Sequence, residues 1–442
     1  MRIVIVGAGA VGSFLAEKLA SEGQDVVVIE SDAKRAVEAQ SEIDCLVING
    51  NGASAETLKG AGLADSDLLI AVSSSDAVNV LACAAGTKVG IPRKVARVED
   101  PQLKAEVEAL GVDLVIDPGE AAARELLQLA SSGDIAELVR FADGEIVLLG
   151  AYIDAGASFV GKTLADLRET VVTWDWLVVA VIRHGETMIA RGATTLESRD
   201  HVLMMARRDA MAEAYEWLGL SSKPAQKAMV LGGTRLAKLT AKMLADRGIH
   251  TTLIDSDMDR CRIIAEDLRD VVTVCADPKD PKVLKSEGIE ATDVVMALSG
   301  WDSENIVGAL VAKSLGAHEV IARLTNTDLV GLLPGIGIDA TVSSRLSAAN
   351  EILRFVRQGV IHSVATFSDS DAEAIELEVG PASPAIGKTL ADLKLPHSLI
   401  VGGVQRGSEA FVPRGNTRIE SGDHLIVIAL PEAIATAEKL SG

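Results

Sequence analysis

Residues 2–12 read Arg-Ile-Val-Ile-Val-Gly-Ala-Gly-Ala-Val-Gly, a run of β-branched residues that opens directly into a glycine-rich loop. The run predicts a buried strand, and Gly7, Gly9 and Gly12 have the Gly-x-Gly-x-x-Gly spacing of a dinucleotide-binding turn. That spacing alone is weak in a chain with 39 glycines. Its position after a strand, with the acidic Glu30 at the end of the next apolar run, makes it specific.

The same arrangement returns in the second half of the chain. Met229–Val230 leads into Leu231-Gly232-Gly233-Thr234-Arg235-Leu236-Ala237, so that Gly232 corresponds to Gly7 at an offset of 225 residues. A seven-residue stretch, Gly161–Leu167, recurs unchanged as Gly387–Leu393. Several collinear motifs separated by few gaps indicate a duplication of the form A-B-A′-B′.

Unit A alternates apolar runs with helical stretches, which predicts an α/β fold with a Rossmann-like, doubly wound parallel sheet. The expected strands are residues 2–6, 26–30, 45–48, 68–72, 95–98 and 114–116. Unit B carries paired short strands, such as 176–182 and 201–205, and predicts a small α+β C-lobe. We expect four domains with a linker near 220–226: N-lobes at residues 1–140 and 226–362, and C-lobes at 141–222 and 363–442.

The first glycine loop predicts a nucleotide site. Gly7 permits the tight turn, Gly9 lets the backbone approach a pyrophosphate, and Gly12 allows close contact between helix and strand. The following helix N-terminus offers amide donors and partial positive charge to phosphates. Glu30 is placed to accept hydrogen bonds from a ribose diol and would repel a 2′-phosphate, which favours NAD(H) over NADP(H).

Loops at the carboxyl ends of other strands should line the same crevice. Ser73–Ser75 follow a strand expected beside the first one, and Asn51 and Gly52 are placed to close over the adenine side. Arg97 is a charged residue in an apolar run. It is either part of a surface salt bridge or a phosphate or inter-subunit contact, and its recurrence as Arg323 favours the contact.

The second copy of the loop is altered. Thr234 replaces the middle glycine and Ala237 the third, while Asp255 keeps the acidic position. A β-branched threonine would obstruct a pyrophosphate, so the second site is either empty or holds a nucleotide differently. Retention of polar residues at equivalent positions argues against complete loss: these are Asp255, Asp277, Ser299 and Arg323.

Composition excludes several classes. The formal net charge of −21 over 442 residues repels nucleic acid and anionic lipid, and 3% aromatic residues give little stacking surface. Cysteines without C-x-x-C spacing and scattered histidines predict neither a disulfide framework nor a metal site. Since no apolar run approaches the roughly 18 residues of a membrane span and no signal peptide is evident, we expect a soluble cytoplasmic protein. The cysteines are Cys45, Cys83, Cys261 and Cys275.

Over essentially its whole length the chain resembles the Trk-type potassium-uptake regulators, the TrkA proteins, which are built from tandem RCK (regulator of potassium conductance) units. The motifs that carry the resemblance are the Gly7–Gly12 loop, Glu30, Ser73–Asn79, Ala96–Val98, and the GKTLADL and S-x-D-H stretches of each B unit. The A-B-A′-B′ order is more specific than any of these alone.

The resemblance implies a peripheral subunit on the cytoplasmic face of the inner membrane. It implies a ring, typically a homotetramer, beneath a TrkH- or TrkG-like integral-membrane potassium transporter, without direct insertion into lipid. NAD(H), ATP or ADP would bind the N-lobes and change the ring's shape, which gates potassium flux. The expected first-site residues are Gly7, Ala8, Gly9, Ala10, Val11, Gly12, Glu30, Asn51, Gly52, Ser73, Ser74 and Arg97. The second-site candidates are Gly232, Asp255, Asp277, Ser299 and Arg323.

Two alternatives stay open. An NAD-dependent dehydrogenase would need a proton-transfer residue facing Gly9. The candidates in the B units are His184, His201 and His424. Because His201 and His424 are better explained as the first residues of strands, we expect no catalytic residue. The other alternative is a similar ring that serves a different cation channel or antiporter.

Overall fold

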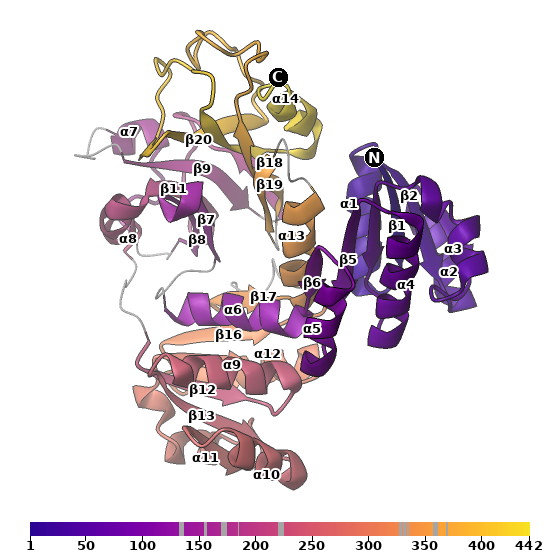
Figure 1. Cartoon of the computed structure of the whole chain (residues 1–442). Helices are drawn as coiled ribbons and strands as arrows, with labels where there is room; N and C mark the ends of the chain where they lie inside the picture. Colours follow the sequence, from indigo (N-terminus) through magenta and orange to yellow (C-terminus); the bar gives the residue numbers. More distant parts are fainter. Residues whose placement is uncertain are drawn as a thin grey trace. The chain divides into compact units, whose positions relative to one another are not determined.

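The computed structural model describes residues 1–131, 137–153, 157–168, 175–183, 185–219, 225–326, 329, 333, 336–356, 361–367 and 370–442. His184 and most of the expected linker, residues 220–224, lie outside this set. The chain forms two compact units (Figure 1). Unit 1 comprises Met1–Ala122 and Ser344–Val356, and unit 2 comprises Ala123–Ser343 and Arg357–Gly442.

Unit 1 contains a six-stranded parallel sheet in the order β3-β2-β1-β4-β5-β6. Its strands are β1 (Arg2–Val6), β2 (Asp25–Glu30), β3 (Leu46–Asn49), β4 (Leu68–Ala71), β5 (Arg93–Arg97) and β6 (Leu114–Ile116). These confirm the strands expected from the sequence to within two residues at each end. Strands are added to one side of β1 up to β3 and then to its other side from β4 onward. Folds of this type bind ligands at this switch point, between β1 and β4.

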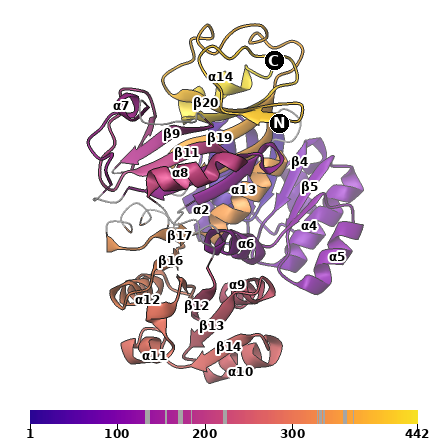
Figure 2. The same cartoon turned by 90° about the vertical axis from the view of Figure 1, so that its left-hand side faces the viewer.

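Helices cover both faces of this sheet, which is why β1 is apolar throughout. Ile3 and Ile5 pack with α1 (Ala10–Ser21), whereas Val4 and Val6 pack on the other face with α4 (Asp76–Val89) and α5 (Pro101–Ala109). Figure 2 shows α4 and α5 beside β4 and β5. A strand buried on both faces loses the polar–apolar alternation of a half-exposed strand. The remaining helices of this part of the chain are α2 (Ala33–Glu42) and α3 (Ala55–Gly60).

A helix from the second half of the chain completes unit 1. This helix, α13 (Ser344–Val356), packs against α1 and β6, and Ala348, Ile352 and Leu353 are fully buried in the α1 core. Arg93 holds its carboxyl end. The guanidinium donates to the Val356 carbonyl at 2.8 Å and to the Phe355 carbonyl, and its carbon lies 4.4 Å from the Phe355 ring centroid.

Unit 2 contains a second sheet of the same topology, β14-β13-β12-β15-β16-β17. The predicted duplication of the nucleotide-binding fold is therefore confirmed. Its strands are β12 (Lys227–Leu231), β13 (His250–Asp255), β14 (Val271–Cys275), β15 (Val294–Ala297), β16 (Glu319–Arg323) and β17 (Ala340–Val342). Its helices are α9 (Arg235–Asp246), α10 (Met258–Asp267), α11 (Pro281–Ser286) and α12 (Asp302–Ser314).

Unit 2 also contains two five-stranded antiparallel sheets, which confirms the small α+β lobes. The first, β10-β9-β11-β8-β7, joins β7 (Glu137–Phe141), β8 (Ile146–Tyr152), β9 (Trp176–Arg183), β10 (Glu186–Ile189) and β11 (His201–Arg207). The second, β18-β19-β22-β20-β21, joins β18 (Ile361–Phe367), β19 (Ser370–Glu378), β20 (Leu399–Arg406), β21 (Glu409–Phe411) and β22 (His424–Ala429). The helices of these lobes are α7 (Leu164–Arg168), α8 (Met211–Leu218) and α14 (Ile434–Glu438). Helix α6 (Pro118–Ala130) precedes β7 and is divided between the two units after Ala122.

The repeated Asp-His turn of the C-lobes has a structural role. Asp200 is 1% exposed, and both of its carboxylate oxygens accept hydrogen bonds from Arg183 at 2.7 Å. Asp423 and Arg406 repeat this arrangement in the second lobe. His201 and His424 begin β11 and β22, as the strand-start interpretation expects.

Candidate nucleotide-binding sites

The first glycine loop has the close contacts that the sequence predicts. Gly7 adopts a φ of +104°, and a Cβ on it would lie 2.8 Å from the Cα of Ser73. A Cβ on Gly12 would lie 1.9 Å from the Gly7 carbonyl oxygen, so only glycine lets α1 start this close to β1. At Gly9, by contrast, a Cβ would meet no atom within 4 Å. The loop is therefore tightly packed against the protein at its two ends and open at its middle glycine.

The helix that follows this loop is open to an anion. Gly9 is the N-cap of α1 and provides no side-chain cap, and the first turn contains no acidic residue. The first amides of a helix have no partner within the helix and carry the positive end of its dipole. The start of α1 can thus donate hydrogen bonds to a phosphate.

Glu30 ends β2 beside this loop and is 5% exposed. Its Oε2 accepts a hydrogen bond from the Ala8 amide at 2.8 Å, and its Oε1 accepts one from the Asp32 amide at 2.8 Å. The carboxylate therefore anchors the glycine loop through the Ala8 amide. The Ser31 hydroxyl also donates to Oε1 at 3.3 Å, so the acceptor position left for a ribose hydroxyl lies on Oε2.

A buried amide holds the other wall of the crevice. Asn79 is fully buried; its Nδ2 donates to the carbonyls of Ser73 at 3.0 Å and Arg97 at 2.9 Å, and its Oδ1 accepts from the Ser73 amide at 2.9 Å. Asn79 thus positions Ser73 against Gly7. It was missing from our predicted site, although its recurrence as Asn305 was visible in the sequence.

The remaining first-site candidates contribute differently. Asn51 is exposed and closes a turn by accepting from the Ala53 amide at 2.9 Å, while Gly52 lies where a Cβ would be 2.2 Å from Val6. Arg97 forms an ion pair with Glu99, which agrees with the salt-bridge interpretation. The glycine loop, Glu30, Gly52 and Ser73 are therefore brought together at the switch point. Ala10 and Ser74 are exposed beside them, and Ala8 and Val11 are buried.

The second site keeps the same frame. Gly232 has a φ of +108°, and a Cβ on it would lie 2.9 Å from the Cα of Ser299. Asp255 accepts from the Gly233 amide at 2.6 Å, as Glu30 does from Ala8. Arg323 donates to the Ser299 carbonyl at 3.0 Å. Asp277, after β14, is exposed; the hydrogen bond from the Lys279 amide lowers its pKa.

Two side chains distinguish the second site from the first. The Thr234 hydroxyl accepts from the Ala237 amide at 3.2 Å and donates to the Leu298 carbonyl at 2.7 Å. The first turn of α9 therefore has one amide, that of Ala237, paired with a side-chain cap, whereas α1 has no such cap. Arg260 also pairs with the Asp255 carboxylate at 2.9 Å. Sequence reasoning missed Arg260, since an arginine on a helix reads as a surface residue until the fold places it near an acid.

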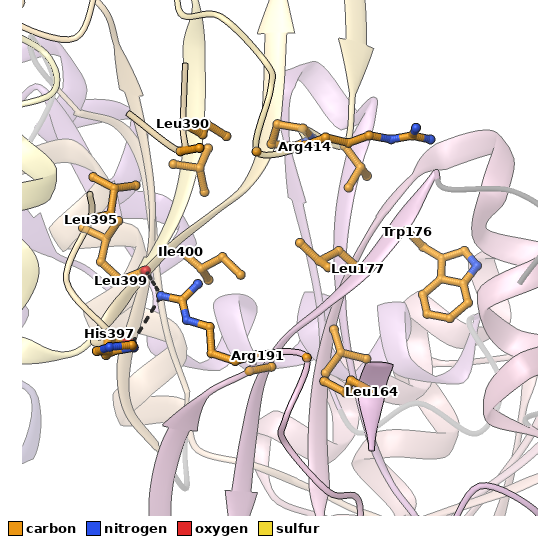
Figure 3. A pocket seen from close by; sticks show the side chains of 18 of the residues that line it. Leu164, Trp176, Leu177, Arg191, Leu390, Leu395, His397, Leu399, Ile400 and Arg414 are labelled. Atoms are coloured by element: carbon orange, nitrogen blue, oxygen red, sulfur yellow. Dashed lines mark hydrogen bonds between the residues drawn. The ribbon is translucent and has the colours of Figure 1, made fainter. Parts of the chain in front are cut away.

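A separate cavity of about 540 Å³ lies between the two C-lobes (Figure 3). Its lining is mostly apolar, with Leu164, Leu177, Leu390 and Ile400 facing it from the two lobes. Arg191 crosses it and donates to the Leu399 carbonyl at 2.7 Å. The sequence pattern gives no sign of this cavity, because it forms only where the two lobes meet.

No helix among the described residues is long and apolar enough to cross a bilayer. The same residues contain no group of three or more His, Cys, Asp or Glu side chains arranged to hold a metal ion.

The fold and the two crevices define a chain of tandem dinucleotide-binding-type domains, each followed by an antiparallel C-lobe. The family model described as the TrkA-N domain matches residues 3–118 and 228–344, and the one described as the TrkA-C domain matches residues 148–219 and 374–442. The chain belongs to the TrkA family of potassium uptake proteins.

Relatives match over nearly the full length. The chain is 32% identical to the Trk system potassium uptake protein TrkA of Vibrio alginolyticus, over 97% of this chain and 95% of that protein. It is 33% identical to the TrkA homolog of Archaeoglobus fulgidus, over 100% of both chains.

Solved structures with the same fold include the GsuK RCK domain, with a TM-score of 0.61 and 19% identity, covering 100% of this chain and 95% of that one. The GsuK channel bound to NAD has a TM-score of 0.61 and 20% identity, covering 100% of this chain and 78% of that one.

Proposed function

We propose that this chain is a nucleotide-binding regulatory subunit that gates potassium uptake through a membrane transporter, without catalysis of its own. The observation that carries the proposal is the geometry around the first glycine loop. There an uncapped helix N-terminus, the open face of Gly9 and the Glu30 carboxylate lie together at the switch point. These are the groups that a pyrophosphate and an adjacent ribose require.

We infer NAD(H) as the first-site ligand, with ATP and ADP as further candidates. All of these share a ribose and a diphosphate, so the helix N-terminus and Glu30 would hold the common part. The fold likeness includes a GsuK channel bound to NAD and a GsuK structure bound to ADP, and that likeness supports the choice of ligand class. A 2′-phosphate would place negative charge against the Glu30 carboxylate, which disfavours NADP(H).

We infer a weaker or different second site. The Thr234 hydroxyl already pairs one amide of the α9 N-terminus, and Arg260 already neutralises part of the Asp255 charge. A nucleotide there would have to replace these contacts. The duplication would then give two crevices with different ligand preferences in one chain.

The gating role follows from linkage. A nucleotide shifts an equilibrium between two arrangements only by its difference in affinity for them. The expected partner is a TrkH- or TrkG-like membrane subunit, with this chain assembled as a homotetrameric ring on its cytoplasmic face. The full-length relatives named as Trk system proteins support this assignment over a regulator of another channel or antiporter.

Co-reconstitution tests the proposal. The purified chain and its membrane partner would be placed in potassium-loaded vesicles, and flux would be recorded with and without NADH, ATP and ADP. We expect at least one nucleotide to change the flux, and the Glu30→Ala variant to lose the NADH response. Steady NADH consumption with a cell metabolite would favour the dehydrogenase instead, and nucleotide-independent flux would contradict gating.

A further inference from the structure

Two cysteines meet beside the second crevice. Cys275 is the last residue of β14 and pairs in the parallel ladder with Asp255 of β13. Cys261 lies in the first turns of α10, the helix that starts after Asp255 and Asp257. Although the two cysteines lie 14 positions apart in the chain, the fold places α10 against β13 and β14 and brings them near each other.

The sulfur atoms of both cysteines lie near the backbone carbonyls where β13 and β14 end. The Cys261 Sγ lies 3.2 Å from the Asp255 carbonyl oxygen and 3.8 Å from that of Val274, the neighbour of Cys275. The Cys275 Sγ lies 3.9 Å from the Ser256 carbonyl oxygen. Both are free thiols, and the neighbouring Cys275 side chain adds to the burial that raises the pKa of Cys261.

The two cysteines differ in solvent exposure, which sets the order in which an oxidant reaches them. Cys275 is exposed, whereas Cys261 is 5% exposed. An oxidant in solution can therefore reach Cys275 first, and Cys261 is the adjacent thiol that can complete the reaction. The first N-lobe has Ala36 and Asn49 at the equivalent positions, so this dithiol belongs to the second crevice alone.

We propose that Cys261 and Cys275 form a reversible intramolecular disulfide, an oxidative modification site next to Asp255. A hydroperoxide oxidises Cys275: its thiolate sulfur bonds to the terminal peroxide oxygen, the O–O bond breaks, and an alcohol or water leaves after protonation. The Cys261 thiolate then attacks the sulfenic sulfur, the S–S bond forms and water leaves. Two thiols are oxidised by two electrons while the peroxide is reduced, and a cellular dithiol restores both cysteines.

The buried thiol limits the second step without blocking it. Burial raises the pKa of the Cys261 thiol, so only a small fraction of it is ionised at pH 8. Well-oriented neighbouring groups react as though present at up to about 10⁵–10⁸ M. Contact with Cys275 therefore more than offsets the low thiolate fraction. Disulfides of this kind in cytosolic proteins are typically transient and redox-sensing.

The bond would couple oxidation to the second crevice, a consequence that rests on the proposed nucleotide-binding function. It would tie the start of α10, which carries Arg260, to the end of β14, two residues before Asp277. We expect the nucleotide affinity of the second site to change by at least threefold on oxidation, with no change at the first site.

The test uses the full chain treated with hydrogen peroxide, blocked with N-ethylmaleimide and digested without reduction for mass spectrometry. We expect a Cys261–Cys275 cross-linked peptide and loss of two of the four thiols, reversed by dithiothreitol. The Cys261→Ala variant, which copies Ala36 of the first lobe, should instead leave Cys275 as a sulfenic acid that dimedone traps. Cys45→Ser is the control and should oxidise like the wild type.

Three results would overturn the proposal: a dimedone adduct on Cys275 of the wild type with Cys261 still blocked by maleimide, a Cys275 link between two chains, or no reaction of Cys275. Nucleotide titration of the oxidised chain is a separate measurement. If the disulfide forms and the titration is unchanged, the modification site stands and its coupling to the crevice is refuted.

Discussion

The Glu30→Ala substitution tests the first crevice most sharply. In the wild type this carboxylate accepts hydrogen bonds from the Ala8 and Asp32 amides, each at 2.8 Å, and it is 5% exposed. Removing it leaves the buried Ala8 amide and the part-buried Asp32 amide without this acceptor, and it removes the acceptor for a ribose diol. Loss of the ribose bonds alone should weaken NADH binding by roughly 1–3 kcal/mol, which is about 5- to 150-fold in Kd.

The assay is calorimetric titration of NADH and NADPH into wild type and variant, with denaturant unfolding of both. Unfolding separates a ribose contact from a collapsed loop, because each unpaired amide also costs about 1–3 kcal/mol of stability. The NADH-to-NADPH preference should narrow in the variant, since the carboxylate that repels a 2′-phosphate is gone. Asp255→Ala is the matched variant in the second lobe and should leave the first-site affinity unchanged.

An NADH affinity within twofold of the wild type, in a variant that remains folded, would refute the role assigned to Glu30. A weakened affinity with an unchanged NADH-to-NADPH preference would refute the ribose contact and leave only the support that Glu30 gives to the loop.

Three further predictions concern the loop, the helix from the second repeat and the C-lobes. Gly9→Ala should keep the wild-type unfolding midpoint but lose nucleotide binding, whereas Gly12→Ala, whose Cβ would lie 1.9 Å from a backbone oxygen, should lower the midpoint in denaturant titration. Arg93→Ala should destabilise unit 1 by about 1–3 kcal/mol, because the carboxyl end of α13 loses its hydrogen bonds, and unfolding followed by hydrogen exchange in α13 checks this. Arg183→Ala should cost about 3–5 kcal/mol by leaving Asp200 buried and unpaired, and equal thermal stability of variant and wild type would contradict it.

The sequence predicted the parts of the fold that depend on local pattern. Apolar runs such as residues 2–6 and the glycine spacing at Gly7–Gly12 report on burial and turn geometry within one segment, and both are confirmed. The duplication was visible because the two copies of each motif can be compared directly. Glu30 and Asp255 were identified in the same way as ribose acceptors, whereas their hydrogen bonds to the amides of the glycine loops were not predicted.

Contacts between distant segments were not predictable from one sequence. Nothing in the local sequence of α13 shows that it packs against α1 and β6, which lie in the first half of the chain. Arg260 and the Cys261–Cys275 contact depend on how α10 lies over β13 and β14. The cavity at Arg191 requires the two C-lobes to be placed against each other. Each of these contacts can be identified only from the tertiary structure.

The measurement that tests the central claim most directly is calorimetric titration of the purified full chain with NADH, with the cofactor's absorbance followed over hours. The account predicts saturable binding at the first crevice of each chain, abolished by Gly9→Ala, with no loss of NADH. Absence of binding to the folded chain, or binding that Gly9→Ala leaves intact, would contradict it.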